Sequence, residues 1–173
     1  MGSDNPHSHK STSYLETLAE AKRQWAKRHS DTAAEGLVTI SWIIRGADIL
    51  RRGAEDVLKP FGVTFNQFEL LTMLSYSRAG GLPMSKINSR LQLPPPSLTH
   101  LVGKLDAKGL VTRVPNDKDR RSTLVSISES GLELLERSTK HVNEYFENVG
   151  LNQQDQQSLC RLMAKLRDPL ERE

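Results

Sequence analysis

The feature that most constrains the fold of this chain is the stretch of residues 97–128, SLTHLVGKLDAKGLVTRVPNDKDRRSTLVSIS. Its apolar residues first recur at helical spacing as far as Gly109, and then lie in two extended segments, 110–114 and 123–127. A charged turn of residues 115–122 separates the two segments. The sequence therefore predicts a helix followed at once by a β-hairpin with a basic tip, which is the order of elements in a winged helix.

Two short helices joined by a tight turn are predicted before this hairpin. The first covers residues 84–91, with Ile87 and Leu91 inward, and the second begins at the proline run 94–96 and extends to Lys108. Proline is tolerated in a first helical turn because its missing N–H would lack a partner there. The apolar side of the second helix consists of Leu98, Leu101, Val102 and Leu105. Its opposite side carries Ser97, Thr99, His100, Gly103 and Lys104. This arrangement predicts a helix-turn-helix.

Further helices are predicted on the N-terminal side. Residues 1–13 are polar and lack apolar periodicity, which predicts a disordered arm. From Tyr14, apolar spacings of three and four predict a helix that ends between His29 and Asp31. The next helix has an apolar stripe, interrupted by Arg51, of Leu37, Ile40, Ile44, Ala47, Ala54 and Leu58. It ends at residues 59–62, since proline cannot continue a helix. Such a stripe can pack on a partner helix or face its own core.

Thr64 and Gln67 have the spacing of a capping box, which predicts the start of another helix. The apolar face of that helix is expected to contain Phe68, Leu71 and Leu74, with Tyr76 as a further candidate. Residues 79–83 (AGGLP) are predicted to be a loop.

Two helices are predicted after the hairpin. Ser128 caps the first, which ends at Gly150, and Asn152 caps the last, which ends before Pro169. The expected core face of the first is Leu132, Leu135, Val142, Tyr145 or Phe146, and Val149. The expected inward residues of the last are Leu159, Leu162, Met163 and Leu166. Cys160, in the last helix, is predicted to be a buried structural cysteine rather than a redox sensor.

These elements predict a mainly α-helical chain with a small β-hairpin wing. Residues 63–128 form the winged helix-turn-helix, and residues 14–62 and 129–173 supply the terminal helices. The apolar faces of the terminal helices exceed what the small central unit can cover. We therefore expect them to pack on one another across a two-fold axis and to form a homodimer.

Charge and composition limit the classes of function that this chain can have. Residues 84–122 carry a local charge of +5 while the whole chain carries +3, which favours a polyanionic partner. The single cysteine excludes an internal disulfide, and no apolar run approaches the roughly 20 residues of a membrane span, so a cytoplasmic protein is expected. No metal-ligand spacing and no nucleophile–base arrangement is evident. We therefore predict no cofactor, no metal ion and no enzymatic activity.

The predicted helix 95–108 and the hairpin after it favour double-stranded DNA as the partner. Hydroxyl, imidazole and ammonium groups on the outer side of the helix can contact base edges or phosphates. In the hairpin, Asp119 and Arg121 are spaced to pair, which leaves Arg120 to extend toward a narrow minor groove. The alternative is a charged hairpin that only keeps a strand edge soluble.

The segments LPMSKINSRLQL and SLTHLVGKLDAKGLVTRVPNDKDRRSTLVSIS, followed by ESG, resemble the MarR family of bacterial transcription regulators. The resemblance covers roughly residues 37–166 and rests on the run 105–113, the turn 117–121 and the cap 128–131. Two departures are the Gly103-Lys104 pair, where many members have Asp-Arg, and the triple proline.

The resemblance implies an obligate homodimer with intertwined terminal helices and a winged helix-turn-helix that binds a pseudo-palindrome. It also implies control by a small ligand or by oxidation. Carried over by position, the implied DNA-binding residues are Ser85, Lys86, Pro95, Ser97, Thr99, His100, Lys104, Arg113, Asp119, Arg120 and Arg121.

The residues that would bind an effector are less clearly marked. The extra N-terminal helix with Trp25 resembles the urate-responsive branch of the family, whose pocket joins a tryptophan to an acidic residue and arginines. On this basis Trp25 and Glu69 are candidates, and Trp42 and Arg45 on the long helix are others. The alternative is that both tryptophans belong to the dimer core. The resulting prediction is a ligand-responsive repressor, and the alternative is a winged-helix module that binds protein.

Overall fold

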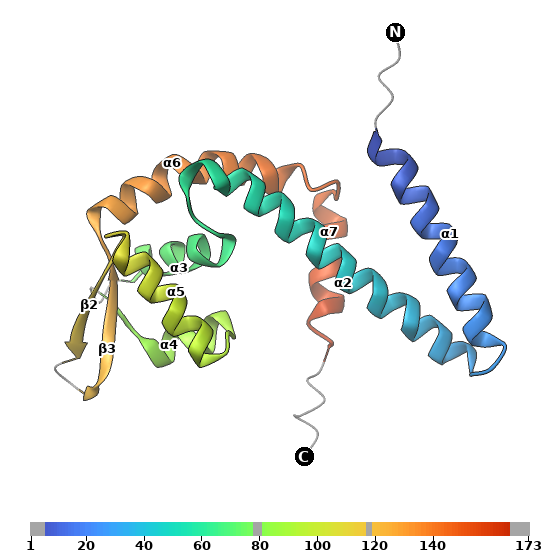
Figure 1. Cartoon of the computed structure of the whole chain (residues 1–173), viewed down its shortest axis with the longest axis horizontal. Helices are drawn as coiled ribbons and strands as arrows, with labels where there is room; N and C mark the ends of the chain where they lie inside the picture. The colour runs from blue at the N-terminus through green and yellow to red at the C-terminus, as the bar shows by residue number, and fades with distance from the viewer. Residues whose placement is uncertain (1–5, 78–80, 117–118, 167–173) are drawn as a thin grey trace, which may run out of the picture. The chain divides into compact units, whose positions relative to one another are not determined.

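The computed structural model of the chain describes residues 6–77, 81–116 and 119–166, with side chains described for residues 14–77, 81–116 and 123–166. Most of these residues are helical, and a small antiparallel sheet accompanies the helices (Figure 1). The predicted fold class is confirmed. The chain divides into two compact units, Met1–Arg52 and Gly53–Glu173.

The first unit contains α1 (Pro6–Ala26) and most of α2 (Asp31–Leu58), and α1 packs against α2. Leu18 and Ala34 are buried between the two helices, and Lys22 forms an ion pair with Glu35. Buried apolar side chains and one ion pair therefore join α1 to α2.

The prediction of a disordered arm is wrong for residues 6–13, which belong to α1. Pro6 is the first helical residue, a position where proline's missing N–H leaves no hydrogen bond unmade. The residues after it are mainly polar, and a helix that continues through polar residues leaves no apolar periodicity to detect. The helix also ends at Ala26, a few residues before the predicted end.

The predicted end of the second helix is confirmed, because α2 stops at Leu58 and a 3₁₀ turn, η1 (Lys59–Phe61), follows. Gly62 closes that turn with φ of 68°, a left-handed conformation that glycine adopts without steric penalty. Near this end the apolar stripe faces the core of its own unit, since Leu58 is buried. Ile40 and Ile44, in the first unit, are instead 60% and 64% exposed.

The second unit begins with the end of α2 and continues into α3 (Phe65–Ser75). The capping box is confirmed: Gln67 N donates to Thr64 Oγ1 at 3.3 Å, and Thr64 N donates to Gln67 Oε1 at 3.0 Å. Phe68, Leu71 and Leu74 are buried as predicted, whereas Tyr76 follows the end of α3 and is 79% exposed, so it does not continue the inward face. A strand, β1 (Leu82–Pro83), lies where a loop was predicted. Two residues are too few to show strand periodicity, and this strand exists only through its pairing partner.

The sheet has the strand order β1-β3-β2 and is antiparallel. The hairpin strands are β2 (Val111–Asn116) and β3 (Asp119–Ile127), so they extend further into the turn than predicted. The regular pairing ends at Pro115–Thr123, where the register shifts, and one further pair follows at Asn116–Asp119. Asn116 and Asp119 were both predicted to belong to the turn, and they can pair because main-chain pairing does not depend on side-chain polarity.

Two helices follow, α6 (Glu129–Glu147) and α7 (Gln153–Met163), and both predicted caps are confirmed. The buried face of α6 agrees with the prediction at Val142, which is buried, but differs at other positions: Leu134 and Ser138 are buried, whereas Leu132 is 47% exposed. On α7 the residues predicted to be inward are exposed, and so is Cys160. The buried cysteine prediction is therefore wrong for the described chain.

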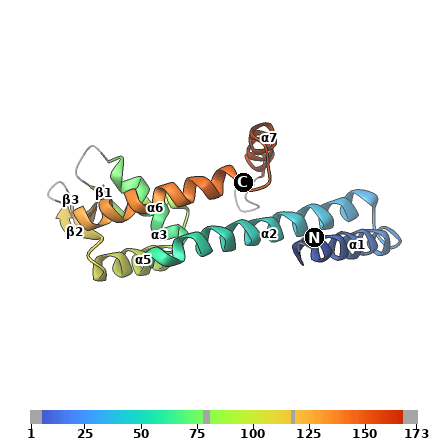
Figure 2. The ribbon, with the colours of Figure 1, turned by 90° about the horizontal axis from the view of Figure 1, so that it is seen from above.

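The core of the second unit forms where α3 lies between α5 (Pro95–Ala107) and α6 (Figure 2). The side chains that meet there come from every helix from the end of α2 to α6, and from the sheet. Examples with no exposed surface are Leu58, Leu70, Ile87, Leu105 and Val125. A core of this kind sets α5 rigidly against the hairpin.

Candidate nucleic-acid interface

Helix α5 presents its polar side to solvent. The four predicted apolar residues, Leu98, Leu101, Val102 and Leu105, are all buried. The residues predicted to contact DNA are exposed on the same helix, namely Pro95, Ser97, Thr99, His100 and Lys104. The helical spacing alone therefore predicted which side of α5 is available to a partner.

The first turn of α5 has few hydrogen-bond donors. Pro94 precedes the helix and Pro95 and Pro96 open it, so Ser97 supplies the first backbone N–H. The Thr99 hydroxyl donates to the Pro95 carbonyl oxygen at 3.0 Å. Ser97 is thus the residue of this turn that offers both a backbone N–H and a hydroxyl group.

The preceding helix, α4 (Met84–Leu91), holds the other predicted phosphate contacts. Ser85 and Lys86 are exposed in its first turn, while Ile87 is fully buried and anchors the helix. Gln92 has φ of 50°, and this left-handed residue reverses the chain between α4 and α5. The helix-turn-helix predicted from the sequence is therefore present.

Hydrogen bonds and close packing join α5 to the hairpin. Gly109, with φ of 68°, ends the helix, and the Ser128 hydroxyl donates to the Gly109 carbonyl oxygen at 2.6 Å. Gly131 N donates to Ser128 Oγ at 3.0 Å. A Cβ atom on Gly131 would overlap the Leu110 carbonyl oxygen, so α6 packs directly on the base of the hairpin. The wing is consequently held at a defined angle to α5.

The wing itself is described only in part. Arg113 is exposed on β2, opposite Val125 of β3. The side chains of Asp119, Arg120 and Arg121 lie outside the described residues, so the predicted pairing of Asp119 with Arg121 stays a prediction.

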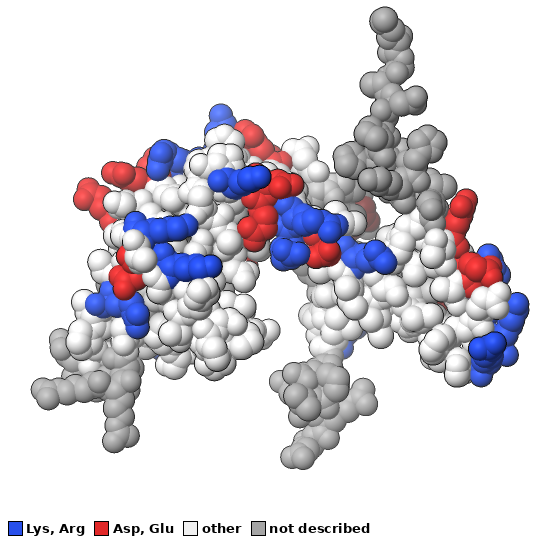
Figure 3. Space-filling model, viewed as in Figure 1, with Lys and Arg blue, Asp and Glu red and all other residues white. Residues whose placement is uncertain are grey.

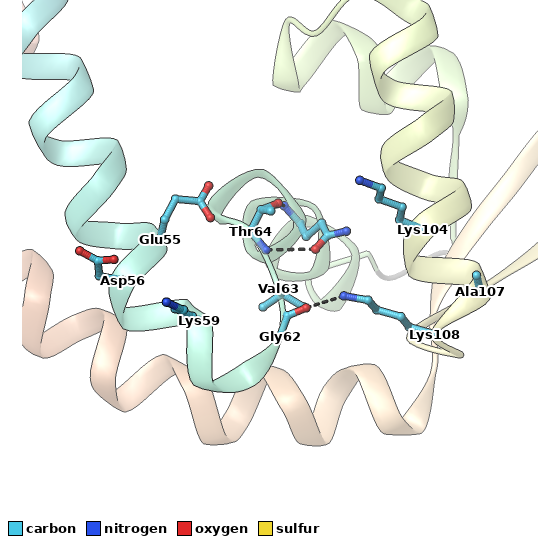
Figure 4. A pocket seen from close by; sticks show the side chains of 10 residues that line it. Glu55, Asp56, Lys59, Gly62, Val63, Thr64, Lys104, Ala107 and Lys108 are labelled. Carbon is cyan, nitrogen blue, oxygen red and sulfur yellow. Dashed lines mark hydrogen bonds between the residues drawn. The ribbon is translucent and has the colours of Figure 1, made fainter.

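A cavity of about 600 Å³ lies beside α5, between that helix, η1 and the start of α3 (Figure 4). Lys104 and Lys108 point from α5 toward it, and Lys108 Nζ donates to the Gly62 carbonyl oxygen. On the other wall, Glu55 accepts a hydrogen bond from Phe65 N at 3.2 Å and so ties α2 to the start of α3. The two lysines at the C-terminal end of α5 therefore lie on the side of the helix that faces this cavity.

Two of the candidate effector residues come together in the first unit. The Trp42 and Tyr14 rings meet edge to face with centroids 5.2 Å apart, and the Arg45 guanidinium lies 4.2 Å from the Tyr14 centroid. Trp25 packs instead on His29, with ring centroids 4.6 Å apart. Tyr14 is the member of this cluster that sequence reasoning missed, because aromatic contacts between helices leave no local spacing signal.

Glu69 belongs to the second unit, on the exposed side of α3. Partial burial of its carboxyl group raises the pKa of Glu69 above its ordinary value. Glu55, Lys59 and Lys108, which line the cavity, were not among the predicted site residues. Their charges are ordinary for surface helices, so nothing in the sequence singled them out.

Two kinds of feature are absent from the part of the chain that the structure describes. No cluster of three or more His, Cys, Asp or Glu side chains has the geometry of a metal site there. Among the described helices, none has the length and apolarity needed to cross a membrane.

Comparisons with known proteins agree with this geometry. A model described as MarR family matches residues 61–122. The chain is 31% identical over 112 residues to YhbI, an HTH-type transcriptional regulator of Bacillus subtilis, covering 65% of this chain and 70% of YhbI.

Two solved structures from Streptomyces coelicolor are similar. The MarR family transcriptional regulator Sco5413 has a TM-score of 0.68 and 31% identity, covering 75% of this chain and 91% of that one. Sco3205, a MarR family regulator solved in complex with DNA, has a TM-score of 0.70 and 25% identity, covering 76% and 84%.

Proposed function

Because the chain belongs to the MarR family of transcriptional regulators, we propose that it binds operator DNA as a homodimer and represses transcription until a small molecule releases it. The observation that carries this proposal is the exposed polar side of α5, held against the hairpin by a shared core. The similar regulator Sco3205 was solved in complex with DNA, which supports DNA as the partner.

Each subunit would place α5 in a major groove, with half-sites about one helical turn apart. Ser97, Thr99 and His100 would contact base edges or phosphates. Further phosphate contacts would come from Ser85, Lys86, Lys104 and Arg113. The wing would follow the neighbouring minor groove, where Arg120 would insert, with Asp119 and Arg121 shaping the tip.

The dimer would be built from residues 14–62 and 129–173, as predicted from the sequence. Exposed apolar side chains on both stretches support this assignment, including Leu15, Ile40, Ile44, Leu159 and Leu162. A ligand that changes the spacing of the two recognition helices would weaken operator binding, since both half-sites must be reached at once. Trp25, Trp42, Arg45 and Glu69 stay candidates for contacts to that ligand.

We further propose a cytoplasmic protein without enzymatic activity, as the regulator names of its relatives suggest. A protein-binding winged helix is the alternative, and no structural observation favours it.

The test is binding of the purified protein to its own upstream DNA, titrated over salt. Replacement of Lys104 or Arg120 by alanine should reduce the slope of log K against log salt by about one for each phosphate that is no longer neutralised. Lys140→Ala, which removes an exposed lysine on α6, is the matched control and should leave the slope unchanged. A flat salt dependence, with equally weak binding to upstream and random duplexes, would support the protein-binding alternative instead.

A further inference from the structure

The middle of the outward side of α5 carries no charged residue. Pro96, Thr99, His100 and Gly103 follow one another there at spacings of three, one and three, opposite the buried leucines. We call these four residues the central row. Lys and Arg side chains lie over the C-terminal end of α5 in Figure 3, while the surface over its N-terminal end is uncharged. Bidentate contacts to guanine or adenine edges are made by Arg, Lys, Asn or Gln, and none of these residue types is in this row.

The central row also offers few hydrogen-bond donors. Pro96 has no N–H, and the hydroxyl hydrogen of Thr99 is engaged with the Pro95 carbonyl oxygen. The parts of these two side chains left for a partner are a proline ring, a methyl group and a hydroxyl oxygen that can only accept. His100 is the polar residue of the row.

Gly103 is unusual for its position in the middle of a helix. Glycine in the interior of a helix has a much lower helix propensity than alanine. A Cβ atom at Gly103 would meet no atom within 4 Å among the described residues, so the packing of the chain there does not require glycine. A surface that approaches the helix backbone closely would require it.

From these observations we infer that α5 recognises the 5-methyl group of thymine through Pro96 and Thr99, with Gly103 allowing close approach of the DNA. This rests on the proposed function and names the base chemistry that the DNA surface reads. Thymine is the base whose major-groove edge carries a methyl group, and apolar side chains are its natural contacts.

The test uses an operator selected from a random duplex library and substitutes deoxyuridine for thymidine at one position at a time. Deoxyuridine keeps the base pair and removes only the methyl group. At the thymines under the start of α5, affinity should fall about fourfold for one half-site and about 15-fold for both, as expected for one buried methyl group each. Substitutions in the flanking sequence should have no effect.

Two variants tie the effect to the central row. Pro96→Ala should bind the thymidine and deoxyuridine operators equally at the position that Pro96 contacts. Pro60→Ala removes an exposed proline from η1 and should keep the discrimination of the original protein. If Pro96→Ala still discriminated as the original does, Pro96 would not be the methyl contact.

Gly103→Ala should weaken operator binding about tenfold, because one added methyl group is forced into a close contact. Its midpoint of thermal unfolding should stay equal or rise, since alanine favours the helix. A lower midpoint would show instead that Gly103 serves the fold.

The outcomes separate this inference from the proposed function. Steep, salt-dependent operator binding with a flat deoxyuridine scan would overturn the inference and leave the proposed function standing. Absence of any preferred duplex, with no salt dependence, would overturn both.

Discussion

Gly131 shows at the scale of one residue how the wing is attached. It lies in the first turn of α6, where its N–H donates to Ser128 Oγ. The added Cβ of an alanine would overlap the backbone oxygen of Leu110 and would lie 2.8 Å from Ile127 Cγ1. The Leu110 carbonyl oxygen accepts a hydrogen bond from Ser128 N at the base of the hairpin, so it cannot move aside without disturbing that bond, and any Cβ at position 131 is strained.

We therefore expect Gly131→Ala to lower the free energy of unfolding by about 1–3 kcal/mol, the usual range for overpacking. Gly53→Ala is the matched control, because the atoms nearest to its Cβ would be the end of the Tyr145 side chain and not backbone. That variant should change stability by less than about 1 kcal/mol, since a ring can rotate away and alanine favours the helix. Urea unfolding of the two variants measures the difference, and equal effects would contradict this account.

The capping residues are also a residue-scale feature, and they were predicted correctly. Thr64, Ser128 and Asn152 each accept a hydrogen bond from the backbone N–H three residues later. Sequence reasoning succeeds here because donor and acceptor lie within one helical turn. The positions of Ser97, Thr99 and His100 on α5 were predicted for the same reason, since helical spacing is a local property.

At the scale of an element, α6 shows why the buried face of a helix is harder to predict. Its apolar residues allow two faces, and the one chosen from the sequence included Leu132. The face that packs contains Gly131, Leu134, Ser138 and Val142. Ser138 satisfies its hydroxyl by donating to the Leu134 carbonyl oxygen at 2.9 Å, so a serine can occupy a fully buried position.

This assignment predicts different effects for two leucines of α6. Leu134→Ala should lower the free energy of unfolding by about 2–5 kcal/mol, because it leaves a cavity in the core. Leu132→Ala should change it by less than about 0.5 kcal/mol in the monomer, since the side chain is 47% exposed. Chemical denaturation at low protein concentration compares them, and a larger loss for Leu132→Ala would mean that the packed face has been assigned wrongly.

At the scale of the whole molecule, α7 has an apolar surface that the described chain does not cover. Leu162 is 60% exposed and Leu159 is 41% exposed on this helix. Under the proposed function this surface belongs to the homodimer. If a second copy of the chain buries these leucines, their apolar surface is removed from water, which favours association.

We expect Leu162→Glu to shift the dimer toward monomer, because a carboxylate would replace a buried apolar group. Gln157→Glu introduces the same charge at another exposed position of α7 and serves as the control. Light scattering over a dilution series should show dissociation at a protein concentration at least roughly tenfold higher for Leu162→Glu. An unchanged dimer in that variant would place the subunit interface elsewhere.

The sequence by itself determined the order of the elements, the helix caps and the solvent-facing residues of α5. Each depends on residues within a few positions of one another, so the physical cause lies in the local chain. It also carried the resemblance that the comparisons confirmed.

Tertiary structure alone decided the pairing of β1 with β3 and the buried face of α6. It also decided that Lys104 points toward the cavity beside α5 and that the space next to Gly103 is open. These properties depend on which distant segments of the chain approach one another. The residues next to a two-residue strand, or next to a glycine in a helix, do not show which distant residues will lie beside it.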